Sequence, residues 1–254
     1  MVMKRWFLLF SILGVILGSA VLRAEEVQKP AISVESTGKV AAKADLAVVC
    51  LSIKSTAPLA ADALSQNNKR VEEVKSRLAA LGYKDDKVKF SGNRFAPAGG
   101  GIFYGGQRPT GFDVYNFVFV LVDGPELNDV TQLNTRVSTL LDELGKLGAS
   151  PNETPISRIS MGGTSVVAFT VKDPSSYEKE ARQRAIDKAR DVAEDIARHM
   201  KAQITGVDSV ISAAEPRVQE PFPNPLDELP YHYFSSSMEE VPIRVGMTVR
   251  YSYK

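Results

Sequence analysis

Three stretches of the chain repeat apolar residues every three or four positions, and segments with strand-like patterns separate them. The first stretch begins at Pro58 and ends at Gly82, the second ends at Gly148, and the third runs from Asp173 to about Met200. Apolar residues at this spacing lie along one face of a helix, so each stretch predicts an amphipathic α-helix. Such a helix must bury its apolar face against another element.

Segments that favour β-strands flank each predicted helix. The strongest is Phe112 to Val122, an almost continuous apolar run that predicts a strand buried on both faces. Residues 32–40 and 45–54 predict a first pair of strands, and the short link between them favours a hairpin-like return. Further strands are expected at 87–90, 156–159, 164–171, 203–212 and 241–253. Pairs of strands between single helices predict an α+β fold, in which three amphipathic helices pack on antiparallel β-sheets.

Two residues within these apolar patterns have more than one interpretation. Asn67 is the one polar residue on the apolar face of the first helix, and we expect it to be half-exposed, although a buried Asn that fixes packing register is the alternative. Cys50 is the single cysteine, so the chain cannot form an internal disulfide. A buried thiol that acts as a small apolar side chain is expected, with an intermolecular disulfide or a redox role as the alternatives.

Two long segments, 91–111 and 215–242, are rich in glycine or proline and predict flexible surface loops without regular structure. The glycines of the first segment match neither of the phosphate-binding glycine motifs. Both segments carry aromatic residues, and exposed aromatic side chains in loops favour contacts with other molecules. The candidate contact residues are Ile102, Phe103, Tyr104, Tyr231, Tyr233 and Phe234.

The first 24 residues have the order of features found in a secretory signal peptide. Lys4 and Arg5 precede an apolar run, and small residues follow, so cleavage is expected after Ala20 or Ala24. An uncleaved membrane anchor is the competing interpretation. After cleavage we expect one domain over residues 25–254, without a stable transmembrane segment.

The composition leaves few residues for catalysis or for metal binding. The chain has 31 basic and 30 acidic residues, which gives no general attraction to nucleic acid. It has two histidines, His199 and His232, and no sequence motif that pairs them with other metal ligands or with a nucleophile. We therefore expect no catalytic residues, no bound metal and no cofactor.

Several short pieces of the sequence resemble the SIMPL-domain family of exported proteins, which includes bacterial periplasmic proteins of oxidative-stress defence. The resemblance extends from Ile32 to Tyr253, with Ser36 and Ala44 at positions where the family has glycine and proline. Its pieces are Ile32-Ser33-Val34 with Gly38, Ala44 to Ala47, Gly111-Phe112, Leu144 to Ala149, Tyr177 to Arg182, Ala185 to Arg190 and Val245 to Tyr253. The resemblance implies a periplasmic location and a role in envelope or oxidative stress tolerance, and it supplies no catalytic residues.

Taken together, these patterns predict a non-enzymatic exported protein that self-associates. The physical basis for self-association is the alanine-lined third helix, the alternating terminal strand and the two aromatic-bearing loops. The alternative is a binding module, in which the two loops hold a small ligand or an envelope protein partner. Association with the outer membrane stays open at this point.

Overall fold

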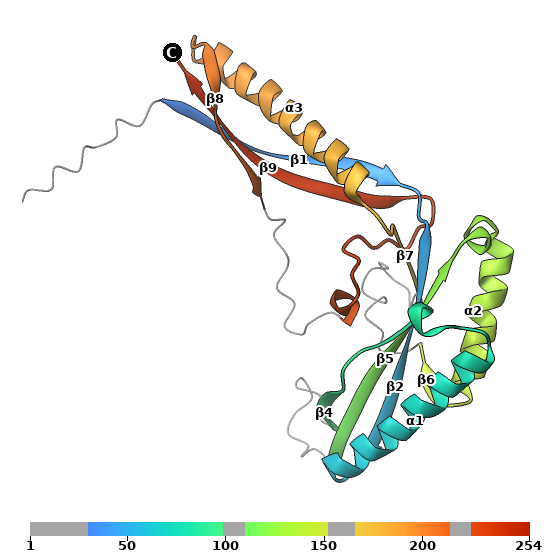
Figure 1. The fold of residues 1–254 in the computed structure, drawn as a ribbon. Coiled ribbons are helices and arrows are strands. Elements are labelled where there is room, and N and C mark those ends of the chain that lie inside the picture. Colours follow the sequence, from blue (N-terminus) through green and yellow to red (C-terminus); the bar gives the residue numbers. More distant parts are fainter. Residues whose placement is uncertain (1–29, 99–109, 152–165, 214–224) are drawn as a thin grey trace, which may run out of the picture.

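The protein is described here by a computed structural model that covers residues 30–98, 110–151, 166–213 and 225–254. These residues form two antiparallel β-sheets and three α-helices, which confirms the α+β fold. Figure 1 shows two lobes that meet at a bend, an extended arm with one helix and a second lobe with two helices. The predicted signal peptide, the strand expected at 156–159, and Ile102, Phe103 and Tyr104 lie outside the described residues.

The arm consists of a three-stranded sheet with one helix on it (Figure 1). The strand order is β1 (Ala31–Ala42), β9 (Val241–Tyr253) and β8 (Ile204–Ala213). The helix α3 (Ser175–His199) presents an alanine stripe to the sheet and polar residues to solvent. The stripe consists of Ala181, Ala185, Ala189, Ala193 and Ala197, all at most 3% exposed.

Small residues bring α3 unusually close to β1. Gly38 of β1 faces the backbone of Ala181, and the hydroxyl of Ser36 donates a hydrogen bond to the carbonyl oxygen of Ala185 at 2.7 Å. A larger side chain on either surface would separate the two layers. The alanine stripe seen in the sequence is therefore the packing surface of α3.

The second lobe has a six-stranded sheet with two helices on one face. Its central strands are β2 (Leu46–Ala57) and β5 (Gly111–Asp123), which pair along their whole length. The other strands are β3 (Val88–Phe90), β4 (Arg94–Ala98), β6 (Ala149–Ser150) and β7 (Val167–Thr170). The helices are α1 (Ala60–Ala80) and α2 (Val130–Gly145), and short 3-10 helices occur at Asp85–Lys87, Pro125–Asn128 and Pro225–Glu228.

The helices α1 and α2 bury the apolar faces that their sequence spacing predicts. Val74 and Leu78 of α1 and Leu140 and Leu144 of α2 are at most 1% exposed and pack on β2 and β5. Gly82 ends the turn after α1 with a φ of 87°, a conformation that glycine adopts without strain. The side chain of Asp129 caps the N-terminus of α2, and β5 is buried on both faces as expected.

The opposite face of the six-stranded sheet is covered by residues 225–234, the covering segment, and not by an α-helix. Leu226 and Leu229 are 1% and 4% exposed and pack with Cys50 and Phe119 of the sheet. The expectation of a surface loop without regular structure over 215–242 needs correction in part, because Pro225–Glu228 forms a 3-10 helix, Leu226 and Leu229 lie in a core, and β9 begins at Val241. Cys50 is fully buried, as the sequence suggested.

The predicted hairpin between the first two strands is wrong. β1 pairs along its whole length with β9, whereas β2 pairs with β5 in the other sheet. The chain turns from one sheet into the other at the bend after Ala42 instead of folding back. Strand periodicity identifies the buried face of a strand but does not identify its partner, because pairing is set by distant segments.

Two further expectations need correction. The segment 91–111 contains the strand β4, which pairs with β5 from Arg94 to Ala98, so at least this part is regular structure. Asn67 is 0% exposed, and the expected half-exposed side chain is instead part of the core.

The short strand β6 carries no signal in the sequence, since two residues are too few to show a period.

Candidate functional site

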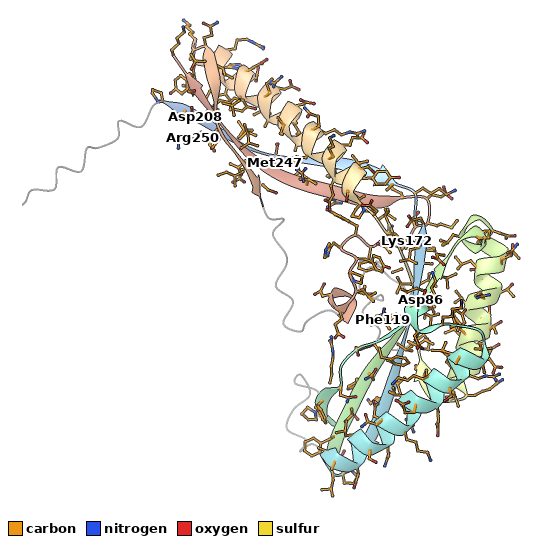
Figure 2. All side chains as sticks on the ribbon, in the orientation of Figure 1. Asp86, Phe119, Lys172, Asp208, Met247 and Arg250 are labelled. Carbon is orange, nitrogen blue, oxygen red and sulfur yellow. The ribbon has the colours of Figure 1, made fainter. Side chains whose placement is uncertain are left out.

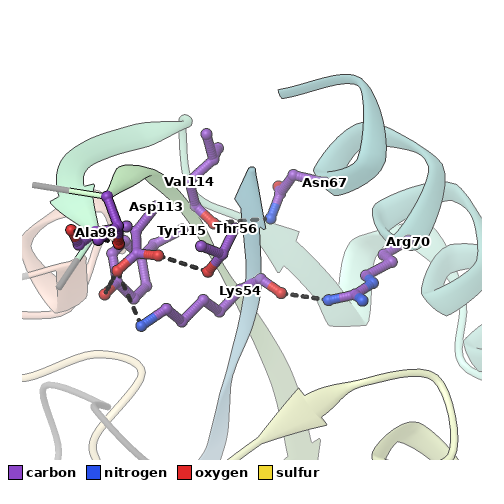
Figure 3. A network of polar contacts seen from close by, with 9 residues as sticks. Lys54, Thr56, Asn67, Arg70, Ala98, Asp113, Val114 and Tyr115 are labelled. Atoms are coloured by element: carbon purple, nitrogen blue, oxygen red, sulfur yellow. Dashed lines mark hydrogen bonds and ion pairs between the residues drawn. The ribbon is translucent and has the colours of Figure 1, made fainter. Parts of the chain in front are cut away.

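A group of polar side chains lies on the face of the six-stranded sheet opposite α1 and α2 (Figure 3). Lys54 and Thr56 of β2 lie directly across from Tyr115 and Asp113 of β5. Facing residues of antiparallel strands point to the same side of a sheet, so the four side chains converge. The carboxylate of Asp113 accepts hydrogen bonds from Thr56 at 2.5 Å and Tyr115 at 3.1 Å, and lies 3.0 Å from the Lys54 ammonium.

The environment of Asp113 keeps its carboxyl group ionised. Burial alone raises the pKa of Asp113, but the hydrogen bonds from Thr56, Lys54 and Tyr115 outweigh burial, and the net pKa is lowered. Both carboxylate oxygens are engaged, and the Lys54 ammonium also lies 5.0 Å from the centre of the Tyr115 ring. A carboxylate with a low pKa and occupied oxygens is a weak proton acceptor, so this cluster suits a structural role better than general-base chemistry.

A second set of charged contacts joins β4 to the covering segment. Arg94 lies 2.9 Å from the carboxylate of Glu228, and the same carboxylate accepts a hydrogen bond from the backbone N–H of Gly92 at 3.3 Å. The guanidinium of Arg94 also lies 5.5 Å from the centre of the Phe117 ring. These contacts hold the 3-10 helix Pro225–Glu228 against the sheet.

The bend between the two lobes carries its own ionic cluster. Lys87 lies 2.6 Å from the carboxylate of Asp123, and Lys172 contacts the same oxygen. Hydrogen bonds from Lys172 and Lys87 lower the pKa of Asp123. Asp45, one of the residues that carried the family resemblance, accepts a hydrogen bond from the backbone N–H of Lys172 at 2.8 Å. Asp45 therefore fixes the chain where it passes between the lobes.

Asn67 serves the core in a way that its position on an apolar face did not reveal. Its side-chain amide donates to the carbonyl oxygens of Ile53 at 3.0 Å and Val114 at 3.1 Å, and so ties α1 to both central strands. Its Oδ1 atom has no hydrogen-bond partner within the described part of the chain. Buried amides of this kind fix how two layers pack, which agrees with the alternative interpretation of Asn67.

The predicted contact residues that the structure describes take part in internal contacts. Tyr231 and Phe234 are half-buried against the core that contains Cys50. Tyr233 packs at the bend, and its hydroxyl donates to Glu178 of α3 at 2.9 Å. The structure does not bring these side chains together as one exposed patch, and their role in contacts with other molecules stays a prediction.

A group of exposed apolar residues on the arm did not stand out from the sequence. Val207, Val210 and Ile211 of β8 are 54%, 46% and 60% exposed. They sit in a segment correctly predicted as a strand, but a strand pattern does not say whether the strand lies inside a sheet or at its edge. Their exposure follows from the position of β8 at the edge.

We also examined the structure for a surface pocket, for a metal site and for a membrane-spanning helix. A pocket of about 400 Å³ lies between α2 and the turn after α1, where the Nε atom of Arg136 donates to the Tyr83 hydroxyl at 2.9 Å. Within residues 30–98, 110–151, 166–213 and 225–254, His, Cys, Asp and Glu side chains form no group of three that could hold a metal ion. Of the helices described, none is long and apolar enough to cross a bilayer.

Helix-backed antiparallel sheets in two lobes, joined at a bend, define the class of this protein as α+β. A family model described as SIMPL, protein of unknown function (DUF541), matches residues 32–253, and the chain belongs to this family. The match confirms the resemblance found in the sequence. A search of the curated proteins found no matching relative.

Proposed function

We propose that this SIMPL-domain protein is exported and non-enzymatic, and that it acts by associating with further copies of itself. The observation that carries this proposal is the exposed apolar strand β8, in which Val207, Val210 and Ile211 are about half-exposed at the edge of the arm. Unpaired strand edges with apolar side chains favour association with another chain.

The charged clusters support a structural role. Asp113 and Asp123 both have lowered pKa values, because cationic or hydroxyl groups of the same chain donate to their carboxylates. Catalytic acids and bases more often have pKa values shifted toward neutrality. The carboxylate of Asp113 thus stabilises the pairing of two strands, and the carboxylate of Asp123 stabilises the bend.

Self-association fits the structure better than the alternative of a binding module with two mobile loops. The described parts of those loops, β4 and residues 225–234, pair with or pack on the six-stranded sheet. Leu226 and Leu229 would have to leave a core for the second loop to move as a lid. The outer edge of β8, with which no other described strand pairs, needs no such rearrangement.

A periplasmic location and a contribution to envelope or oxidative stress tolerance complete the proposal. Both rest on the amino-terminal signal-peptide pattern and on the family resemblance. Fractionation of cells that express the full chain is the test of location, with recovery in the cytoplasm as the contrary result. If the exported protein acts in tolerance, the full chain should restore peroxide tolerance to a deletion strain. A chain that lacks residues 1–24 should not restore it.

The decisive test of self-association is sedimentation and light scattering of the mature protein, residues 25–254, over a concentration series into the micromolar range. The proposal predicts a mass above that of the monomer that rises with concentration. A monomer at every concentration would overturn it.

A further inference from the structure

β8 lies at the edge of the arm sheet and carries three exposed apolar side chains, Val207, Val210 and Ile211. Its one strand partner within the described chain is β9. Val207 and Val210 lie opposite Tyr251 and Val249, which face α3, whereas Ile211 lies on the other face of the sheet. An edge strand with exposed apolar side chains is a site at which another chain can add.

The helix of the arm leaves β8 uncovered. The apolar cluster beneath α3 contains Val34 of β1 and Val249 of β9, but from β8 it includes the partly buried Ile204 and neither Val207 nor Val210. Figure 1 shows α3 running along β1 and β9. Among the described residues, no element covers the side chains of Val207, Val210 and Ile211, and no strand pairs with the outer edge of β8.

The other edge of the arm sheet is protected against pairing. A guanidinium nitrogen of Arg184 donates to the carbonyl oxygen of Lys39 in β1 at 2.9 Å, which occupies a backbone acceptor at that edge. Glu35 and Lys39 also place charges along β1. Charged side chains and capped backbone groups discourage the addition of a further strand.

β8 has almost none of these protections. From Ile204 to Ala213 it contains no Lys, Arg, Glu or Pro, and its one charged residue is Asp208. The carboxylate of Asp208 lies 3.8 Å from Arg250 of the neighbouring strand, and Figure 2 shows the two residues together on the arm. Because this charge is compensated within one chain, two copies of β8 can approach each other without strong repulsion.

We propose that β8 pairs with β8 of a second copy of this chain, antiparallel about a two-fold axis near Val210 and Ile211. This inference rests on the proposed self-association and specifies its interface. An antiparallel pair is self-complementary, since each copy offers the same backbone donors and acceptors. The product is a continuous sheet in the order β1, β9, β8, β8, β9, β1, with both α3 helices on the same face.

The size of the contact predicts how strong the association is. Pairing about this axis overlaps about seven residues of each β8, from Val207 to Ala213, over about 23 Å, so a strip about 10 Å wide covers roughly 230 Å² on each copy. Stable interfaces bury about 800 Å² on each partner, so strand pairing alone gives a weak, concentration-dependent dimer. Contact between the Val210 side chains of the two copies adds apolar area on the face that α3 leaves open.

The first test compares two matched substitutions in the mature protein by sedimentation. V210K places a charge on the unpaired edge, and V192K places the same charge on an exposed apolar position of α3, where Val192 is 40% exposed. We expect V210K to raise the concentration needed for association at least tenfold and V192K to leave it unchanged. Circular dichroism confirms that both variants stay folded.

The second test detects the paired strands directly. S209C, V210C and I211C are oxidised one at a time, with V192C as the control, and the native Cys50 does not compete because it is fully buried. Same-residue disulfides form only where the Cα atoms of the two copies lie within about 7 Å. A covalent dimer is expected for at least one of the three variants and not for V192C.

The outcomes separate the interface from self-association itself. If the wild-type protein associates, but V210K behaves like wild type and none of the three β8 cysteines cross-links, the β8 interface is overturned while self-association stands. If the wild-type protein is monomeric throughout, the proposed function and the interface both fall. If a different protein cross-links to the β8 cysteines in place of a second copy, the pairing of two β8 strands is overturned.

Discussion

Gly38 of β1 lies so close to Ala181 of α3 that a Cβ atom on Gly38 would come within 1.8 Å of the Ala181 carbonyl oxygen. The two layers of the arm thus meet backbone against backbone at this point. The nearby hydrogen bond from Ser36 to the carbonyl oxygen of Ala185 depends on the same close approach. The position of α3 over β1 and β9 is therefore set by residues with small side chains.

We expect Gly38→Ala to destabilise the protein by about 3 kcal/mol or more, because the added methyl group must push α3 away from β1. Urea unfolding followed by circular dichroism measures the loss. Gly145→Ala is the matched control, since a Cβ atom there meets no other atom within 4 Å. Equal stability of the two variants would show that the arm can relax around Gly38.

The alanine stripe shows what the sequence could supply and what it could not. Ala185 and Ala189 recur at helical spacing, so the sequence predicted both the helix and its small-residue face. It could not show that Gly38 is the opposing residue, because Gly38 and Ala181 lie far apart along the chain and meet only in the folded arm. The same limit explains the wrong hairpin: β1 and β2 are neighbours in sequence, but their partners lie far along the chain.

We expect Asn67→Asp to cost about 3 kcal/mol or more of folding free energy at neutral pH. A carboxylate at this fully buried position cannot donate to Ile53 and Val114, and it would be an unpaired buried charge. Chemical denaturation of the variant measures the loss. Asn68→Asp, one residue along α1 at an exposed position, is the control and should change stability by less than about 0.5 kcal/mol.

The stabilising effect of Asp113 should depend on pH. Its pKa is lowered in the folded protein, so Asp113 contributes stability above its unfolded pKa of about 3.9 and loses that contribution as the pH falls through the lower folded value. Hydrogen bonds to a charged group contribute about 1.5–3 kcal/mol, and we expect Asp113→Asn to lose about this amount at pH 7. The difference between the wild-type protein and the variant should shrink steadily below about pH 4.

Unfolding curves of both proteins between pH 7 and pH 3 are the measurement for Asp113. Asp142→Asn, which changes an exposed carboxylate on α2, provides the comparison for the general effect of removing one negative charge. A stability difference between Asp113→Asn and wild type that is constant with pH would contradict a lowered pKa as the source of the effect.

The polar cluster and the proline-rich segment were hidden from the sequence for a physical reason. Lys54 and Asp113 lie far apart along the chain, and only the register of β2 with β5 brings them together. Leu226 and Leu229 are two apolar residues among prolines, with no period that would mark them as core. Burial of such residues becomes visible only when the surface that they cover is known.

Cys50 reports whether the segment that begins at Leu226 is a fixed cover for the sheet. The thiol is fully buried beside Leu226 and Leu229, and burial raises its pKa, so we expect it to react with a thiol reagent only when the cover opens. Leu226→Ala should leave a cavity, cost about 2–5 kcal/mol and speed labelling of Cys50. The measurement is the rate of labelling in the native state against the free energy of unfolding.

Leu78→Ala separates opening of the cover from unfolding of the whole protein. Leu78 is 1% exposed and lies in the core on the other face of the sheet, so its removal lowers stability without touching the cover. If the cover opens locally, Leu226→Ala labels faster than Leu78→Ala at equal stability, because Cys50 is reached without global unfolding. If the labelling rate of Cys50 depends on the free energy of unfolding in the same way in both variants, residues 225–234 leave the sheet only when the whole lobe unfolds. The segment is then an integral layer of the fold.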